Sequence, residues 1–486
     1  MGKDLIKVPI LDMLKEHRIK KPISMHVPGH KNGVILHEGT PQTFSSVMLW
    51  DMTELSKLDD LHQPEEGIKE AEALLSDFYK TKRSYFLVNG STVGNLAMIL
   101  GSLNAGDKVI VQRNSHKSVM NGLKLANANP VFLSPIIDME LGIPIGVPYE
   151  TICNSLNEHP DAKAIIITYP NYYGLGIELS SIIKEAHKRG ILVLVDEAHG
   201  AHFAAGSPFP PSAVSLGADI VVHSAHKTLP AMTMGSYLHI NSDLVNQQHV
   251  EEYLRMLQSS SPSYPIMLSL DLARAYLEGY GDKDKEYLLE RIEIFKRYFW
   301  NHEQMGIVES KDSDIQDLLK LIVYHKNGLT GYELQRLMEE AGVFTELADE
   351  QYVLLILPLL ENNQSFPFDE IIQRLETINW AADKGATIST PLLRDSWSNH
   401  EQSKESTLAI SYDAMNKTPQ KRISLSDACG EISAETIIPY PPGVPLIQRG
   451  EIITNDMIQK CISLLNQGAK IQGGLYLNQQ QIQVFE

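Results

Sequence analysis

The sequence predicts an α/β protein in which a large domain with a mostly parallel sheet precedes a smaller C-terminal α+β domain. Short β-branched segments alternate with helical patterns between residues 84 and 240. Most of these segments are apolar throughout, which indicates strands buried on both faces, as in a parallel sheet. A chain of 486 residues suits one large domain with smaller additions, or about three domains of ordinary size.

We expect helices to connect the strands of the large domain. One helix is expected over Thr92–Leu103 and another over Ser180–Lys188, which ends just before Gly190, a residue typical of a C-cap. Upstream, a short helix at Ile10–His17 leads into the turn-rich segment 27–33. The predicted strands are Tyr85–Val88, Lys108–Val111, Pro130–Leu133, Ala164–Thr168, Ile191–Val195, Asp219–Val222 and Gly235–Ile240.

The sequence pattern changes after the predicted sheet. A long helical region is expected around Asp271–His302, and later strands at Leu318–Tyr324 and Tyr352–Ile356. The proline-rich segment Ile437–Gly450 is expected to form an ordered, extended turn rather than regular structure. These changes predict an N-terminal arm over residues 1–60, a large domain over 61–310 and a C-terminal region of one or more small domains over 311–486.

The net charge is −18, from 42 lysines and arginines against 60 aspartates and glutamates. Nucleic acid is therefore an unexpected partner, because its recognition needs a basic surface, whereas an acidic surface favours a cationic substrate. The N-terminus has no signal-peptide pattern, and no apolar run is long enough to cross a bilayer. Three widely spaced cysteines fit a reducing compartment. We expect a soluble, cytoplasmic protein.

Two motif matches suggest other functions, a helicase and a metal site, which the rest of the sequence does not support. Asp196-Glu197-Ala198-His199 spells the box of ATP-dependent helicases, but that function requires a phosphate-binding P-loop, and the sequence has none. The pairs His199/His202 and His223/His226 offer four imidazoles for a metal. Their spacing is shorter than in helical zinc sites, and no H-E-x-x-H motif or cysteine pair supports them. We therefore expect no metal site.

A better explanation places these motifs at the ends of neighbouring strands. Ligands of open α/β sheets bind outside the carboxyl ends of the strands. Asp196 directly follows one predicted strand, and Lys227 comes shortly after another. Asn89–Gly94 follows a third strand and opens a helix, which makes an anion site from small residues, hydroxyls and a helix N-terminus.

A phosphate site, a lysine and a carboxylate together suit pyridoxal 5'-phosphate. That cofactor requires a phosphate nest, a Schiff-base lysine and an aspartate beside its pyridinium nitrogen. Each residue alone has a simpler explanation, because Asp196 could cap a helix and Lys227 could be a solvated lysine. The coincidence of all three at strand ends favours the cofactor.

Four motifs, in order along the chain, closely resemble the bacterial ornithine/lysine/arginine decarboxylase family. The similarity covers nearly the whole chain and includes Pro28-Gly29-His30 near its start. It implies the aspartate-aminotransferase-like fold, called fold type I, in a short form without the family's N-terminal wing domain, and a homodimer with active sites at the subunit interface. The motifs are Val195–His202, Ser224–Leu229, Arg113–Ser118 and Tyr440–Pro445.

The resemblance also implies roles for individual residues. Lys227 corresponds to the lysine that bonds the cofactor covalently, Asp196 to the pyridinium partner and His116 to the imidazole that stacks on the ring. His116 also follows a predicted strand, although a turn histidine would fit that position equally well. A small residue at Ala198 leaves room for the other ring face. The implied cofactor-binding residues are Gly90, Ser91, Thr92, Val93, His116, Asp196, Ala198, His199, Ser224, His226 and Lys227.

The residues that would hold the far end of a substrate are less clearly indicated. His199 stands where the long enzymes carry tryptophan, and Arg449 where the family pattern has proline. The candidate substrate-binding residues are His30, Glu435 and Glu451, with Asp427 as a further carboxylate. Each of the three carboxylates is more simply explained as a surface or capping residue.

The sequence thus predicts a pyridoxal-phosphate decarboxylase of a basic amino acid: arginine, lysine or ornithine. Its product would be a polyamine-type amine. Two alternatives remain at this point. One is an aminotransferase or carbon–sulfur lyase on the same scaffold, and the other is a cofactor-binding regulator or scaffold protein.

Overall fold

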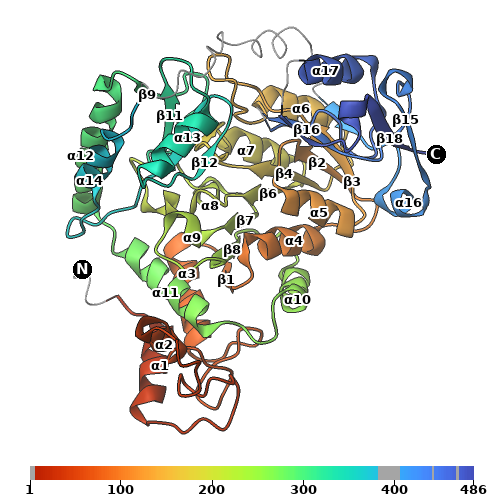
Figure 1. Ribbon diagram of the computed structural model, residues 1–486. Helices are drawn as coiled ribbons and strands as arrows, with labels where there is room; N and C mark the ends of the chain where they lie inside the picture. The colour runs from red at the N-terminus through yellow and green to blue at the C-terminus, as the bar shows by residue number, and fades with distance from the viewer. Residues whose placement is uncertain (1–5, 381–404, 441–442, 467–469) are drawn as a thin grey trace. The chain divides into compact units, whose positions relative to one another are not determined.

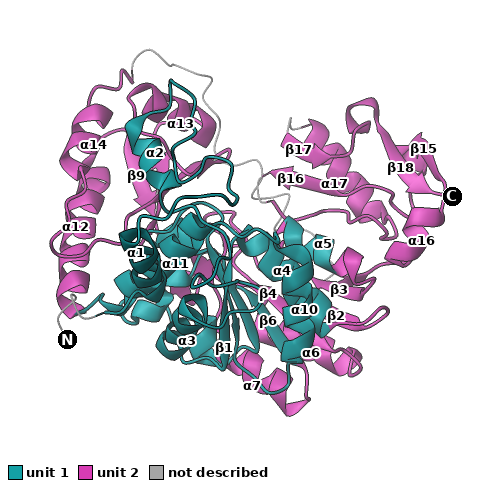
Figure 2. Cartoon of the chain, turned by 90° about the horizontal axis from the view of Figure 1, so that it is seen from below, with its two compact units in different colours: residues 1–102, 117–122, 192–281 teal, residues 103–116, 123–191, 282–486 magenta. Residues whose placement is uncertain are grey.

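The computed structural model describes residues 6–380, 405–440, 443–466 and 470–486 (Figure 1). The chain forms two compact units, shown in different colours in Figure 2. The first comprises residues 1–102, 117–122 and 192–281, and the second residues 103–116, 123–191 and 282–486. Each unit therefore combines segments that are distant in sequence. The boundaries predicted near residues 60 and 310 stay a prediction.

The first unit holds four strands in the order β1 (Arg83–Leu87), β8 (Ser236–Ile240), β7 (Ile220–His223) and β6 (Leu192–Asp196). Strands β6 and β7 run parallel, whereas β8 is antiparallel to both of its neighbours. Helix α4 (Gly90–Ser102) packs against all four strands. Its close approach depends on a missing side chain, because a Cβ at Gly94 would lie 2.7 Å from both Leu87 and Val222.

Several further helices of the first unit pack against these strands or against one another. Helix α3 (Gly67–Tyr79) begins beside Asp59, whose carboxylate accepts hydrogen bonds from the backbone N–H groups of residues 65, 66, 68 and 69. This arrangement satisfies the free donors of the helix N-terminus. The other helices are α1 (Pro9–Ile19), α2 (Gln42–Met48), α8 (Ala213–Leu216), α9 (Ala225–Thr228), α10 (Gln247–Leu257), α11 (Tyr264–Glu278) and the 3₁₀ helix η2 (Ala201–Ala205).

The second unit holds the order β4 (Ala164–Thr168), β2 (Lys108–Gln112), β3 (Asn129–Leu133) and β14 (Glu405–Thr407). The first three strands are parallel and β14 is antiparallel to β3. An antiparallel sheet follows, in the order β12 (Leu347–Ala348), β13 (Tyr352–Ile356), β11 (Lys320–His325) and β9 (Met305–Val308). The helices of the unit include α6 (Tyr149–Glu158), α7 (Ser180–Lys188), α12 (Asp282–Asn301), α13 (Gly331–Glu340) and α14 (Phe368–Leu375), and α5 (Lys117–Leu125) crosses the boundary.

The C-terminal part of the second unit has its own apolar core. Helix α17 (Asn455–Asn466) contributes Ile458, Cys461 and Leu464, which are buried together with residues of two small strand pairs. These pairs are β15 (Gln420–Ser424) with β18 (Gln481–Phe485), and β16 (Ile437–Tyr440) with β17 (Lys470–Gly473). Shorter elements are β5 (Leu175–Gly176), β10 (Ile315–Gln316), α16 (Tyr412–Lys417), η3 (Leu425–Asp427) and η4 (Leu477–Gln479).

The predicted fold class is confirmed, and each predicted strand lies within two residues of an observed one. The helical region expected around Asp271–His302 consists of the second half of α11 and of α12, which Gly279 and Gly281 separate. One prediction of detail was wrong: regular structure does occur in Ile437–Gly450, since β16 pairs with β17.

No helix within the described ranges is long and apolar enough to span a membrane.

Candidate functional site

Polar residues of the first unit gather where β1, β6 and β7 end. The loop after β1 leads into α4, and Ser91 in its first turn accepts a hydrogen bond of 2.7 Å from Ser224, which follows β7. Gly90 has a positive φ of 82°, and a Cβ built on it would meet no atom within 4 Å. Open space therefore borders a helix N-terminus that carries two hydroxyls, an arrangement that suits a phosphate.

Asp196 ends β6 and is buried, with 2% of its surface exposed. Its Oδ2 accepts a hydrogen bond of 2.8 Å from Asn95 Nδ2, and its Oδ1 one of 3.2 Å from the backbone N–H of Ala198. Asn95 also donates to Ser118, at 2.9 Å. These donors hold the carboxyl group in place.

Lys227 lies in the short helix α9 directly after β7. Its Nζ is 3.0 Å from Nε2 of His199, which is buried beside it. His226, the preceding residue, directs Nδ1 toward the carbonyl oxygen of Gly235 at 3.0 Å, so its Nε2 remains on the other side of the ring. Of the two histidines, His199 therefore contacts the amine of Lys227, whereas His226 is bonded to the backbone of Gly235.

Four further predicted site residues belong to the first unit: Thr92, Val93, Ala198 and His30. Ala198 and Val93 are buried, and Thr92 is exposed at the start of α4. His30 lies in the N-terminal arm, where its Nδ1 accepts from the Gly33 N–H and its Nε2 is 3.2 Å from Asp51. Because Nδ1 is an acceptor, Nε2 carries the proton and donates to Asp51.

Three histidines of the two H-x-x-H pairs contact other side chains. His199 contacts Lys227, and His223 contacts Glu197 at 2.5 Å. The ring of His202 packs against Phe203 and Phe209.

The other predicted residues belong to the second unit. His116 is exposed and follows β2 by four residues. Glu435 accepts hydrogen bonds from the backbone N–H groups of Leu475 and Gln483, and Asp427 is exposed. Residues 441–442 of the Tyr440–Pro445 motif lie outside the described residues.

Glu451 forms a buried ion pair that the sequence did not indicate. Its two carboxylate oxygens accept from Arg113 at 2.5 and 2.7 Å, and neither side chain is more than 5% exposed. Arg113 also donates to Ser406 and to the Pro445 carbonyl oxygen. This arrangement favours the structural alternative for Glu451, because both of its oxygens are already engaged.

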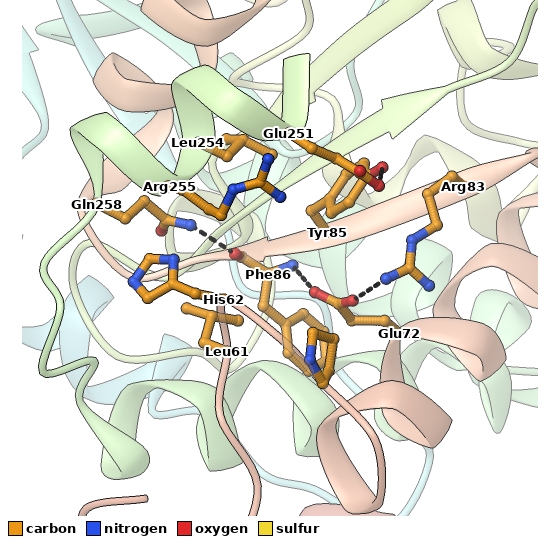
Figure 3. A pocket seen from close by; sticks show the side chains of 11 residues that line it. Leu61, His62, Glu72, Arg83, Tyr85, Phe86, Glu251, Leu254, Arg255 and Gln258 are labelled. Carbon is orange, nitrogen blue, oxygen red and sulfur yellow. Dashed lines mark hydrogen bonds and ion pairs between the residues drawn. The ribbon is translucent and has the colours of Figure 1, made fainter. Parts of the chain in front are cut away.

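A separate cavity of about 130 Å³ lies beside β1 and α10 (Figure 3). Its two acidic side chains have partners on its wall: Glu72 accepts from Arg83 at 2.7 Å, and Glu251 accepts from Tyr85 at 2.7 Å. Burial raises the pKa of Glu72 to about 7, in spite of the nearby Arg83. No predicted site residue lines this cavity. It adjoins the loop between β1 and α4, since Gln258 on its wall accepts from the Val88 N–H.

Comparisons with known proteins identify the family of the chain. Residues 8–320 match the family model "Orn/Lys/Arg decarboxylase, major domain", and residues 392–476 match the model of its C-terminal domain. The "Uncharacterized protein YaaO" of Bacillus subtilis (strain 168) is 44% identical over 99% of both chains. An arginine decarboxylase of the same organism is 33% identical, over 96% of this chain and 95% of the relative. The structure of the Escherichia coli constitutive lysine decarboxylase superposes with a TM-score of 0.79 at 18% identity, covering 99% of this chain and 82% of that one.

The fold and the strand-end site define a fold type I enzyme that uses pyridoxal 5'-phosphate. Within that class, the chain belongs to the Orn/Lys/Arg decarboxylase family and is an amino-acid decarboxylase.

Sequence reasoning missed Asn95 and Arg113 as supporting residues. Asn95 lies four residues after Ser91 in α4, and therefore on the same helix face. That spacing was the signal that could have identified it. Nothing in the sequence pairs Arg113 with Glu451, which is 338 residues away.

Proposed function

We propose that this enzyme decarboxylates a basic amino acid: arginine, lysine or ornithine. The observation that carries the proposal is the arrangement of Lys227, Asp196 and the Ser91–Ser224 pair at the strand ends of one unit. Support for a basic substrate comes from the arginine decarboxylase relative and from the net charge of −18, which favours a cation.

The residues of the site fit the cofactor. The N-terminus of α4, Ser91 and Ser224 would hold the phosphate, with Thr92 and His226 beside them. Asp196, fixed by Asn95, would keep a proton on the ring nitrogen. His116 would stack on the ring. When bound, pyridoxal phosphate supplies an electron sink for the electrons that carbon dioxide leaves behind.

Lys227 would bond the cofactor covalently and release it when the substrate amine arrives. His199 lies 3.0 Å from the Lys227 amine, and is therefore placed to take or return its proton. Either group could then protonate the α-carbon of the substrate. The buried setting of Asp196 and His199 limits the access of water to these proton transfers.

The test is a product analysis with the purified enzyme and pyridoxal phosphate. We expect an amine and carbon dioxide from at least one of arginine, lysine and ornithine, without any 2-oxoacid as co-substrate. The Lys227→Ala variant controls for contaminating activity. A neutral or acidic amino acid as the only substrate would refute the proposed specificity, and dependence on a 2-oxoacid would indicate an aminotransferase.

We also propose that the enzyme is a homodimer in the cytoplasm. Large apolar side chains are exposed along the N-terminal arm, which supports contact with a second copy. The three free cysteines support a reducing compartment. The exposed apolar residues are Ile19, Ile23, Met25, Val27, Val34, Ile35 and Phe44.

The test of a shared site is complementation between two inactive variants. If His30 serves the site of the partner, mixing Lys227→Ala with His30→Ala should produce heterodimers with one intact site and part of the wild-type activity. Light scattering establishes the dimer, and a differently tagged pair confirms subunit exchange. An active monomer, or an inactive mixture after confirmed exchange, would contradict the shared site.

A further inference from the structure

A row of buried side chains crosses the first unit behind the predicted cofactor residues. It starts at Glu197 after β6 and continues through His223 of β7 and His239 of β8 to Ser84 of β1. The successive distances are 2.5 Å, 3.1 Å and 2.8 Å. All four residues are fully buried, so every polar atom in the row depends on its neighbours.

Glu197 is held by three donors. Its Oε2 accepts from Ser212 Oγ at 2.7 Å and from His223 Nε2, and its Oε1 accepts from the Ala213 N–H at 2.9 Å. The hydroxyl and backbone donors fix the carboxyl group, and the imidazole extends the bond to the next strand. Tyr79 covers the two rings of the row, with centroid distances of 5.3 Å to His223 and 4.4 Å to His239.

The two residues of the Glu197–His223 contact are each adjacent in sequence to a predicted cofactor residue. Glu197 directly follows Asp196, and His223 directly precedes Ser224. Consecutive residues of an extended chain point to opposite sides. The Glu197–His223 bond therefore joins the backbone that carries the predicted ring partner to the backbone that carries a predicted phosphate ligand.

We propose that Glu197 is a positioning residue that, through His223, fixes the separation between Asp196 and Ser224. This inference rests on the proposed roles of those two residues at the ring nitrogen and the phosphate. A cofactor of fixed length can bind both only when their spacing matches it. A bond between the two strand ends holds that spacing before the cofactor arrives.

The hydrogen-bond directions predict how substitutions behave. Burial, reinforced by the neighbouring His223, lowers the pKa of His239 well below its usual value, so His239 is neutral. In one consistent pattern, His223 donates to Glu197, His239 donates to His223, and Ser84 donates to His239. A glutamine at 197 can donate its amide N–H to His223, which reverses the remaining bonds without breaking any. Glutamine therefore keeps the link, whereas alanine removes it.

The chain contains a matched control at the opposite end of the same strands. Asp219 precedes β7, is fully buried and accepts a hydrogen bond of 2.7 Å from the Val193 N–H of β6. It therefore also joins β6 to β7, but at the ends that lie away from Asp196 and Ser224. A change there loosens the same strand pair without acting on the predicted cofactor residues.

The experiment measures the affinity of the apoenzyme for pyridoxal phosphate, together with thermal stability, in four variants. We expect Glu197→Ala to bind the cofactor roughly tenfold more weakly, the loss typical when the support of a ligand-binding residue is removed. Glu197→Gln should bind within about twofold of wild type, because its link persists. Asp219→Ala should lose stability but keep its affinity. Glu197→Asp, which is one methylene shorter, should also bind weakly, and it replaces the alanine variant if that variant does not fold.

Three results would overturn the inference. One is unchanged affinity in both Glu197→Ala and Glu197→Asp, and another is a glutamine variant as weak as the alanine variant, which would make charge rather than spacing decisive. The third is an equal loss of affinity in Asp219→Ala, which would show general loosening. Wild-type enzyme that binds no pyridoxal phosphate would instead refute the proposed function, so the two failures can be distinguished.

Discussion

Replacing Glu72 by glutamine should make the stability of the enzyme less sensitive to pH. Glu72 lies in α3 with 1% of its surface exposed. Arg83 and the Phe86 N–H donate to its carboxyl oxygens at 2.7 and 3.1 Å. Burial outweighs both, and raises its pKa from 4.5 to about 7. The folded protein therefore binds this proton more tightly than the unfolded chain does.

The sign and size of the effect follow from that difference. A carboxyl group with a raised pKa contributes stability that is complete below its unfolded pKa of 4.5 and is lost as the pH rises through about 7. Complete loss corresponds to about 3 kcal/mol, and the part lost between pH 6 and pH 8 to about 1.3 kcal/mol. Glutamine does not titrate, so the variant should not lose this part.

The assay compares thermal unfolding of wild type and Glu72→Gln at pH 6 and pH 8. For a chain of this length, the difference corresponds to about 1 °C in the pH-dependent change of Tm. Glu70→Gln removes an exposed charge from the same helix and controls for net charge. The reasoning would be refuted if Glu72→Gln and wild type lost equal stability over this range, since Glu72 would then be ionised throughout.

Three further predictions concern the site and its support. Lys227→Ala should abolish turnover, and borohydride reduction of the wild type should leave a pyridoxyl mass on the Lys227 peptide; a label on Lys117 would contradict the assignment. Asp196→Asn should affect kcat, which falls, more than KM in steady-state kinetics, because the charge of Asp196 matters most as the carbanion forms. A nearly normal kcat would leave Asp196 a structural role. Arg113→Met should destabilise the protein by about 3 to 5 kcal/mol, because it leaves Glu451 buried and unpaired; adding Glu451→Gln should restore part of this in denaturant unfolding.

The strands of the large domain could be predicted because they are short, apolar throughout and separated by clear breaks. Ala164–Thr168 is an example, since every residue favours a buried strand and the next residues favour a turn. The positions at which helices end were harder to predict. Gly279 and Gly281 lie within a continuous helical pattern, and only the structure shows that α11 ends and α12 begins there.

The location of the candidate site could be predicted for those residues that directly follow a strand. Asp196, Ser224 and Lys227 each follow a recognisable strand, so their common location followed from parallel pairing. Partners across the fold could not be found in this way. Glu451 was a candidate for substrate binding because it lies near a family motif, but its carboxylate binds Arg113 of a segment far away in sequence.

The adjacent motif residues separate into two sets because an extended chain alternates its faces. Asp196 and Ser224 contact Asn95 and Ser91 of α4, whereas their neighbours Glu197 and His223 bind each other. The two members of such a pair should therefore differ in what their substitution changes. On the proposed roles, loss of a residue that faces α4 would remove a contact with the cofactor directly. Loss of Glu197 or His223 would leave Asp196 and Ser224 present but less firmly held. The affinity for the cofactor should then fall first, and turnover only after it.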